Sequence, residues 1–276
     1  MPKSQKPAVI EWIYRSLLDA TTGQLTRSIV TQDDVVAGID ATGVGLSKNN
    51  PANFIKDVIR GHGASGMWPE YLKARRVGGR QVTGDRNVFE FISYETDQTE
   101  PFPSRFGYRE DVVRHQVQSL SMPLASKRLG RDDETYLIQV AAKLAVIETH
   151  FALTSPLNVV ELTHLQIGIK LRLTEVDSLY AAVLRHPDGT DEQIIVTAEA
   201  KKRRQRILEE QVMQQVKAAF SATPTDLVVP IAMTAADAGI YVAEFKSVRR
   251  NELSNFQMLE LEAEALYELK PRVPGI

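Results

Sequence analysis

The sequence predicts an α/β protein, with a central mixed β-sheet flanked by helices and a small domain of helices and a hairpin before it. The spacing of apolar residues changes from helical to alternating after Pro156, so strands dominate the later part of the chain. The stretch Thr96–Arg109 holds two prolines, polar residues and a glycine, which is typical of a linker. We therefore expect one domain over residues 1–110 and a second over residues 111–276.

The composition fits a globular protein without covalent cross-links. The chain has 276 residues, of which 43% are hydrophobic and 25% charged, and a formal net charge of −2. It has no cysteine, which excludes disulfides, thiolate catalysis and cysteine-ligated zinc. No apolar run resembles a secretory signal or a membrane span. We expect a cytoplasmic protein that binds no membrane, and any affinity for nucleic acid must come from a local basic patch.

The first domain is expected to contain three helices followed by a hairpin. Helical spacing of apolar residues predicts a first helix over Val9–Leu18. The segment Thr31–Asp34 resembles a capping box that opens a second helix. Asn50-Pro51 marks the start of a third, since Asn caps helices and Pro suits the first helical position. Glycines and alternating apolar residues predict a hairpin within Arg75–Tyr94. This order is that of a winged helix-turn-helix.

The second domain is expected to follow the order helix, three strands, helix, strands, helix. A stripe of apolar residues predicts one long helix over about Asp132–Phe151. Strands are expected over Val159–Leu173, Glu175–Arg185 and Gln193–Ala200, the last two joined by the turn sequence His186–Thr190. The remaining expected elements are a basic helix over Lys202–Phe220, strands over Leu227–Met233 and Gly239–Phe245, and a final helix over Glu252–Glu268.

Two carboxylates and an ammonium group converge in the hairpin around this turn. If Asp188 is the midpoint of the antiparallel pair, Asp177 faces Glu199, with Cβ atoms about 4.5–5.5 Å apart. Lys201 lies two residues beyond Glu199 and points to the same side. A bulge would shift this register by one residue. Facing acids repel each other, and a divalent cation would relieve the repulsion. Hard oxygen ligands favour Mg²⁺, for which Mn²⁺ can substitute.

The segments Glu175-Val-Asp177 and Glu199-Ala-Lys201 are similar to the signature of the PD-(D/E)xK, restriction-endonuclease-like nucleases. The spacer of about twenty residues and the helix, three-strand, helix order also match, over roughly residues 130 to 250. Val176 stands where the signature has its proline, a departure that many members share. The resemblance implies hydrolysis of phosphodiesters, with Asp177 and Glu199 as metal ligands and Lys201 assisting the attacking water.

Members of this superfamily often add an acid from the preceding helix and a glutamine from the following one. The candidates are Glu148 or Glu134 for the acid, and Gln211, Gln214 or Gln215 for the glutamine. We place Glu148 with the catalytic residues, while Glu134 stays open because fourteen residues bring both acids to one helix face. The whole chain resembles a bacterial type II restriction endonuclease with an N-terminal winged-helix domain. This resemblance implies double-stranded DNA as substrate and a homodimer.

Basic and amide side chains outside the hairpin are candidate DNA contacts. From Lys48 to Arg86 the sequence holds eight Lys/Arg and three acids, a patch that suits phosphates. An incidental patch on a protein-interaction module is the alternative. The expected contacts are Lys48, Asn49 and Asn53 as base readers at the third helix, Arg75, Arg76 and Arg80 as phosphate contacts beside the hairpin, and Lys202 and Arg203 beside the active site. Cations are unfavourable at a helix N-terminus, so phosphate contact explains the last two better.

Two other functions stay open. One is a different nuclease, acting in DNA repair or on RNA, and the other is a DNA-binding regulator on a catalytically inactive nuclease fold. The complete Asp, Glu and Lys set argues against the regulator. No Walker motif is present, so no nucleotide cofactor is expected. His150 and His164 lie in apolar stretches and are expected to be core histidines, not metal ligands.

Overall fold

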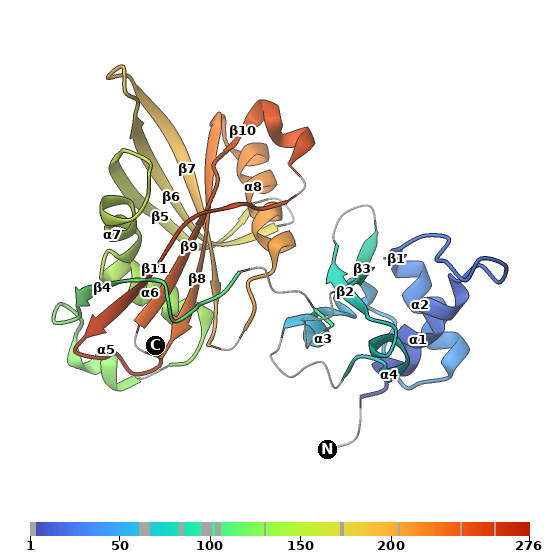
Figure 1. Cartoon of the computed structure of the whole chain (residues 1–276). Coiled ribbons are helices and arrows are strands. Elements are labelled where there is room, and N and C mark those ends of the chain that lie inside the picture. The colour runs from blue at the N-terminus through green and yellow to red at the C-terminus, as the bar shows by residue number, and fades with distance from the viewer. Residues whose placement is uncertain are drawn as a thin grey trace. The chain divides into compact units, whose positions relative to one another are not determined.

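The chain folds into two units, Met1–Arg105 and Phe106–Ile276, each with its own buried core. The boundary falls inside the expected linker over Thr96–Arg109. In Figure 1 the first unit runs from blue to green and the second from green to red. The structure is a computed structural model, and it describes residues 4–60, 67–82, 86–94, 101–102, 106–129, 131–171, 174–203, 205–237, 239–256 and 258–276.

The N-terminal unit combines short helices with a three-stranded antiparallel sheet in the order β1-β3-β2. Its helices are α1 (Lys6–Ser16), α2 (Gln32–Thr42), the 3-10 turn η1 (Pro51–Asn53), α3 (Lys56–Arg60) and α4 (Glu70–Lys73), and its strands are β1 (Ile29–Thr31), β2 (Val77–Gln81) and β3 (Asn87–Ser93). Helix α2 begins at the predicted capping box, because Thr31 and Asp34 each accept a hydrogen bond from the other's backbone N–H.

The third helix differs from the prediction. The segment after Asn50 forms only the single turn η1, and α3 follows over Lys56–Arg60. The Asn50 side chain makes no capping hydrogen bond, so the expected start signal is not used. Phe54 and Ile55 are buried between these two short pieces. Burial of a small apolar cluster, and not helix capping, therefore shapes this segment.

Two glycines that resemble turn residues lie instead in the middle of β2. A Cβ added to Gly78 would come within 1.8 Å of the Pro101 carbonyl oxygen. A Cβ on Gly79 would come within 2.7 Å of the Trp68 ring. Both positions need glycine because another part of the chain approaches the strand closely. Pro101 belongs to the sequence expected as linker, so this residue of the linker packs on the first unit.

The second unit is built on an eight-stranded mixed sheet in the order β4-β11-β9-β8-β7-β6-β5, with β10 paired to β8. The strands are β4 (Val113–Gln118), β5 (Val159–Leu171), β6 (Thr174–Arg185), β7 (Asp191–Lys201), β8 (Leu227–Ala236), β9 (Gly239–Phe245), β10 (Val248–Arg249) and β11 (Leu261–Lys270). The helices are α5 (Leu124–Leu129), α6 (Glu134–Lys143), α7 (Val146–Leu153), α8 (Glu209–Ala222) and the 3-10 helix η3 (Arg250–Asn255). Two pairs, β4 with β11 and β7 with β8, are parallel. The expected α/β class with a mixed, helix-flanked sheet is confirmed.

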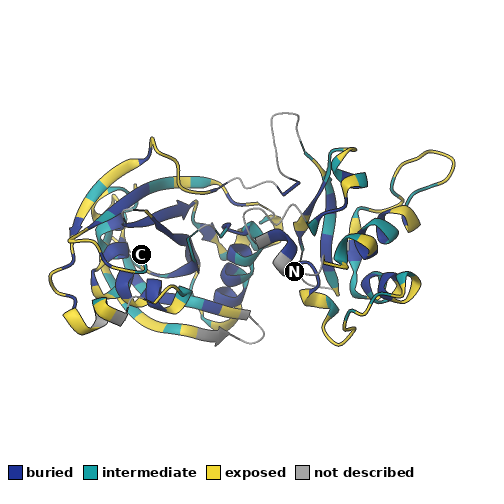
Figure 2. Ribbon diagram, turned by 90° about the horizontal axis from the view of Figure 1, so that it is seen from below, coloured by how far each residue is buried: buried dark blue, intermediate teal, exposed yellow. Residues whose placement is uncertain are grey.

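Helices cover both faces of the curled sheet (Figure 1). The pair α6 and α7 packs with Tyr180 and Ala198, in the main core cluster. Helix α8 packs with Ala232 and Tyr241 on other clusters. Strands β8 and β9 are buried along their whole length, and Figure 2 shows the exposed residues gathered on the outer elements. Glu199 and Lys201 lie at the end of β7, beside these central strands, and Asp177 lies on the neighbouring strand β6.

The expected final helix over Glu252–Glu268 is wrong. This segment forms the short 3-10 helix η3 and then strand β11, which inserts between β4 and β9. Its Ala, Glu and Leu residues favour helices, but pairing on both edges and burial of Tyr267 override that preference. The neighbouring strand β4 and the helix α5 have no counterpart among the expected elements.

Two further helices begin or end elsewhere than expected. The single helix over Asp132–Phe151 is two helices, α6 and α7, bent by 60°. Ala145 breaks them with a left-handed backbone angle φ of 52°. The helix expected to begin at Lys202 begins at Glu209. Within the described ranges no single helix is long and apolar enough to cross a membrane, and α6 with α7 reach that length and composition only together.

Candidate active site

The β6–β7 hairpin has the register that the sequence predicts. Its pairs run from Arg185 with Asp191 to Ser178 with Ala198, all centred on Asp188. The turn is closed by hydrogen bonds from the His186 N–H to the Thr190 carbonyl oxygen and from the Gly189 N–H to the His186 carbonyl oxygen. Gly189 supplies the positive φ of 86° that the turn requires. The next position beyond Ser178 and Ala198 in this register places Asp177 opposite Glu199.

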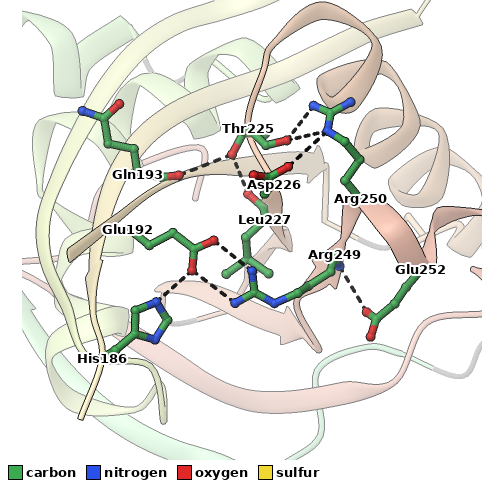
Figure 3. A network of polar contacts seen from close by, with 9 residues as sticks. All are labelled: His186, Glu192, Gln193, Thr225, Asp226, Leu227, Arg249, Arg250 and Glu252. Carbon is green, nitrogen blue, oxygen red and sulfur yellow. Dashed lines mark hydrogen bonds and ion pairs between the residues drawn. The ribbon is translucent and has the colours of Figure 1, made fainter. Parts of the chain in front are cut away.

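An arginine from β10 braces the turn end of this hairpin, as Figure 3 shows. Arg249 donates two hydrogen bonds to the carboxylate of Glu192, at 2.9 and 3.1 Å. The ring of His186 contacts the same carboxylate at 2.8 Å. Hydrogen bonding to Arg249 holds the pKa of Glu192 below its usual range. This cluster ties both strands of the hairpin to β10 and so supports its register.

The next residue, Arg250, braces the helix that follows the hairpin. Its guanidinium donates to the carbonyl oxygens of Phe220 at 2.9 Å and Thr223 at 2.7 Å, at the C-terminal end of α8. It also donates to the carbonyl oxygen of Thr225 at 2.9 Å. These carbonyls would otherwise lack intrahelical partners. The adjacent residues Arg249 and Arg250 therefore position the two elements that carry the candidate site.

Three buried polar side chains and one half-buried acid meet at the end of β7. Glu199 and Lys201 are each only 3% exposed. The Lys201 Nζ atom contacts Glu199 Oε1, and Gln215 Nε2 of α8 donates to Glu199 Oε2. Asp177 Oδ2 accepts a hydrogen bond from the Ala200 N–H at 2.9 Å. The structure thus brings together Asp177, Glu199 and Lys201, as the hairpin pattern predicts.

The electrostatics of Asp177 are unusual. Burial first, and then the negative charge of Glu199, raise the pKa of Asp177 to about 7. The Ala200 N–H and the Lys201 ammonium act in the opposite direction but do not cancel these two effects. A carboxyl group with such a pKa, beside a second acid, is typical of a functional site more than of a stabilising contact.

This raised pKa predicts how the stability of the metal-free protein depends on pH. The folded protein retains a proton on Asp177 that the unfolded chain loses at about pH 4, so stability is lost as pH rises towards 7. The variant Asp177→Asn should escape this loss. A pKa unit corresponds to about 1.4 kcal/mol, and about 1 kcal/mol shifts the Tm of a domain this size by roughly 2–4 °C. We expect the variant to melt higher than the wild type, by a margin that grows from pH 5 to pH 8.

Thermal melts in EDTA at several pH values would measure this margin. The control is Glu175→Gln, which removes an exposed acid two residues earlier on the same strand. It should melt like the wild type at every pH. A margin for Asp177→Asn that is the same at pH 5 and pH 8 would contradict the raised pKa.

The acid beside Lys201 is Glu134, and not Glu148. Glu134 Oε1, in the first turn of α6, lies 3.8 Å from Lys201 Nζ. Glu148 instead lies near Tyr180. Burial, and in addition the charge of Glu148, raise the pKa of Tyr180 to about 12. Tyr180 is three residues from Asp177 on one strand, so it points to the opposite face. The structure does not bring Glu148 to the group, and this corrects its assignment to the catalytic residues.

The three candidate glutamines differ in their contacts. Gln215 is 1% exposed and binds Glu199, while its Oε1 atom has no hydrogen-bond partner in the described part of the chain. Gln214 donates to Glu210, one turn earlier on α8, at 2.7 Å. The side-chain oxygen of Gln211 is buried without a partner among the residues described. Of the three, Gln215 is the one that the structure places in contact with the candidate site.

The basic residues after β7 do not begin a helix. Lys202 and Arg203 lie in the loop before α8, and the first turn of α8 is acidic instead. Arg203 pairs with Asp237 at 2.9 Å and donates to the Ala236 carbonyl oxygen at 3.3 Å. Arg204 lies outside the described residues. We expected Lys202 and Arg203 to contact phosphate because cations are unfavourable at the start of a helix. No helix starts there, so this reason is wrong, although both residues are close to Lys201 in sequence.

Several candidate DNA contacts in the first unit have protein partners. Lys48 contacts Asp40, and Arg80 pairs with Glu90, its neighbour on β3, at 2.6 Å. The expected recognition helix is absent, so the exposed Asn53 lies in the 3-10 turn η1. Asn49 is exposed just before that turn, and its backbone N–H donates to Ser47 at 3.2 Å. These contacts neutralise part of the expected basic patch and leave the base-reading role a prediction.

A cation–aromatic stack marks the other candidates in this unit. The guanidinium of Arg75 lies 3.6 Å from the centre of the Tyr71 ring, and that of Arg15 lies 3.8 Å from it. Arg76 lies over Tyr94 at 5.4 Å. Arg15 was not among the expected contacts, because it lies far from Arg75 in the sequence. Stacking orders these long side chains, and Arg15 is also paired with Glu11 at 2.8 Å.

The two histidines are held by polar side chains. His150 is fully buried, with its Nδ1 atom 2.9 Å from the Tyr267 hydroxyl and its Nε2 atom 2.9 Å from Glu244. His164 Nε2 lies 2.9 Å from Ser178 Oγ, and burial lowers the His164 pKa. Within the described ranges no group of three or more His, Cys, Asp or Glu side chains could hold a metal ion. His150 is thus a core histidine, as expected, whereas His164 is only half-buried on β5 and the expectation is wrong for it.

Comparisons with known proteins give no relative from which a function could be transferred. No family model matches the chain, and no curated protein or solved structure matches it. The case for a function therefore depends on the arrangement of Asp177, Glu199, Lys201 and Gln215.

Proposed function

We propose that this protein is a metal-dependent endonuclease that hydrolyses phosphodiester bonds of double-stranded DNA. The observation that carries the proposal is the group formed by the half-buried Asp177 with the buried Glu199 and Lys201 at the end of two paired strands, with Gln215 against Glu199. Keeping such charges out of water is costly and gives little net stability. The raised pKa of Asp177 supports a functional role for the group.

The residues fit a magnesium ion, for which manganese can substitute. Asp177 and Glu199 offer hard carboxylate oxygens, and burial together with the charge of Glu199 raises the pKa of Asp177. When bound, the metal would polarise a phosphoryl oxygen and make water more acidic. Because the ligands must be ionised, we expect metal affinity to fall as the pH drops below about 7.

The other side chains have roles that follow from their contacts. Lys201 is held between Glu199 and Glu134, so its ammonium is fixed where it can donate hydrogen bonds to charge developing on a phosphate. Gln215 fixes one oxygen of Glu199 through its amide nitrogen. Its free Oε1 atom is an acceptor that can orient the attacking water. Glu134, 3.8 Å from the Lys201 ammonium, helps to position it.

The finer proposal is a type II restriction enzyme that binds DNA through a winged-helix domain and acts as a homodimer. The short helical elements that precede the antiparallel pair β2 and β3 in the first unit support a winged helix. The exposed guanidinium of Arg75, stacked on Tyr71, supports a phosphate contact. The homodimer rests on the resemblance of the sequence to this class of enzyme.

The test is to incubate the protein with plasmid DNA, single-stranded DNA and RNA in the presence of Mg²⁺. Discrete fragments from the plasmid are expected for a site-specific enzyme, while a smear would indicate a non-specific DNA nuclease. Cleavage of RNA alone would favour an RNA nuclease. Binding to DNA without any cleavage, with Mg²⁺ or Mn²⁺, would contradict the proposal and favour an inactive regulator. EDTA controls identify any metal-independent contaminant.

A further inference from the structure

Two arginines line a cleft of about 500 Å³. Two of its lining residues are close in sequence to residues of the candidate active site. Its lining consists of Asp132, Arg203, Arg272, Pro274, Gly275 and Ile276. Arg203 follows Lys201 by two residues, and Asp132 precedes Glu134 by two. Lys201 and Glu134 are themselves only 3.8 Å apart. The cleft therefore adjoins the site through two short stretches of backbone.

The backbone around Arg272 is firmly held. Ser119 donates one hydrogen bond from its N–H to the Lys270 carbonyl oxygen at 2.8 Å, and one from its hydroxyl to the Pro271 carbonyl oxygen. Val273, directly after Arg272, is fully buried in the main core cluster, and Ile276 is 2% exposed. The segment that presents Arg272 is thus anchored on both sides.

The Arg272 side chain differs from most arginines of this unit. It is exposed, and its guanidinium has no hydrogen bond or ion pair with any residue that the structure describes. Carboxylates neutralise the guanidinium groups of Arg109, Arg114, Arg131, Arg185 and Arg249. An unpaired guanidinium on an anchored backbone is prepared to bind an anion, since little of the backbone needs to be ordered.

The second arginine of the cleft is oriented by its contacts. Arg203 is fixed by Asp237 at 2.9 Å and by the Ala236 carbonyl oxygen at 3.3 Å. Asp237 is 92% exposed, so water screens this pair and it leaves Arg203 able to share its donors. Asp132 is the acidic side chain in the lining, beside the two guanidinium groups. The cleft thus offers directed N–H donors from two arginines.

We propose that Arg272, together with Arg203, binds a backbone phosphate of the DNA strand that passes through the active site. The proposal rests on the proposed nuclease function. Guanidinium groups match phosphate oxygens in geometry and can donate two parallel hydrogen bonds. A strand whose scissile phosphate lies at Lys201 must continue past one end of the site, and the cleft lies beside that position. Arg272 is then a positioning residue that fixes the strand and takes no part in the chemistry.

The experiment compares Arg272→Ala with the wild type and with Arg185→Ala. Arg185 is a matched control because it is an exposed arginine at the far end of β6, paired with Asp191 at 2.8 Å. Binding to a duplex oligonucleotide is measured over a salt series with Ca²⁺ in place of Mg²⁺. Arg272→Ala should weaken binding by roughly 3–10-fold and reduce the log–log salt slope by about 0.9, the value for one lost phosphate contact. Arg185→Ala should change neither.

A second measurement locates the phosphate. Duplexes carrying one uncharged methylphosphonate at successive positions near the cut are bound by both proteins. At one flanking position, the methylphosphonate should weaken binding by the wild type. The same methylphosphonate should not weaken binding by Arg272→Ala any further, because the variant already lacks the guanidinium that contacts this phosphate. In single-turnover cleavage the variant should need more enzyme for half-maximal rate, with the rate at saturation unchanged. Arg272→Lys should keep the salt slope and lose part of the affinity.

Two outcomes would overturn the inference in distinguishable ways. If the wild type cleaves DNA but Arg272→Ala keeps its affinity, salt slope and methylphosphonate profile, only this phosphate site is wrong. If the wild type neither binds nor cleaves DNA, the proposed function and the phosphate site both fall. A thermal melt of each variant shows that the comparison is made between folded proteins.

Discussion

The variant Asp177→Asn is expected to cleave DNA at least about a thousandfold more slowly than the wild type, while still binding it. The substitution keeps the shape of the side chain and its contact with the Ala200 N–H. It removes the negative charge that a divalent cation requires, so the chemical step should suffer far more than DNA affinity. Single-turnover cleavage with saturating enzyme would measure the chemical step, and binding in Ca²⁺ would measure affinity.

The matched control for this result is Glu175→Gln, on the same strand and the same side of the alternation. Glu175 is exposed and has no place in the buried group, so its variant should cleave like the wild type. Should Asp177→Asn retain more than a tenth of the wild-type rate, Asp177 would not be a metal ligand. The nuclease proposal would then lose the observation on which it depends.

The second large effect concerns stability. Lys201→Ala is expected to lower the free energy of unfolding by about 3–5 kcal/mol, because Glu199 would remain buried without its cationic partner. Asp177 beside it would increase the repulsion. The double variant Glu199→Gln, Lys201→Met removes both charges and should recover most of this loss, while remaining inactive. Urea unfolding of the three proteins, in EDTA, would measure the differences.

This design separates a buried ion pair from a solvated one. In a solvated pair, Lys201→Ala would cost less than about 1 kcal/mol, and the double variant would recover nothing. That result would be inconsistent with the burial of Glu199 and Lys201. A large loss followed by recovery would indicate that the charges are kept for function, since an uncharged pair would be at least as stable.

The hairpin could be predicted from sequence because two local signals agree on it. Alternating apolar residues identify the strands, and the turn around Asp188 sets the register between them. Together they place Asp177 opposite Glu199 without any knowledge of the rest of the fold. The capping box at Thr31 was predictable for the same reason, since its partners are three residues apart.

Elements that depend on distant partners could not be predicted in this way. Strand β11 contains good helix formers, and it is a strand because β4 and β9 pair with it from opposite sides. The sequence led us to assign Glu148 to the site, whereas Glu134 lies near Lys201. The two acids would share a face only if one continuous helix carried both. The left-handed backbone at Ala145 and the 60° bend separate them. Neither the helix break at Ala145 nor the insertion of β11 between β4 and β9 leaves a clear signal in the local sequence.

The position of the hairpin turn has a consequence for how this sequence can vary in length. The alignment of Asp177 with Glu199 is set by a turn eleven residues away on either side, at Asp188. Deleting one residue from His186–Thr190 would slide one strand past the other and turn one carboxylate towards the opposite face. Adding one residue to each strand beside the turn would lengthen the hairpin and leave the pair aligned. Natural or engineered insertions in this hairpin should therefore be tolerated in matched pairs, and single-residue changes should be lost through selection for activity.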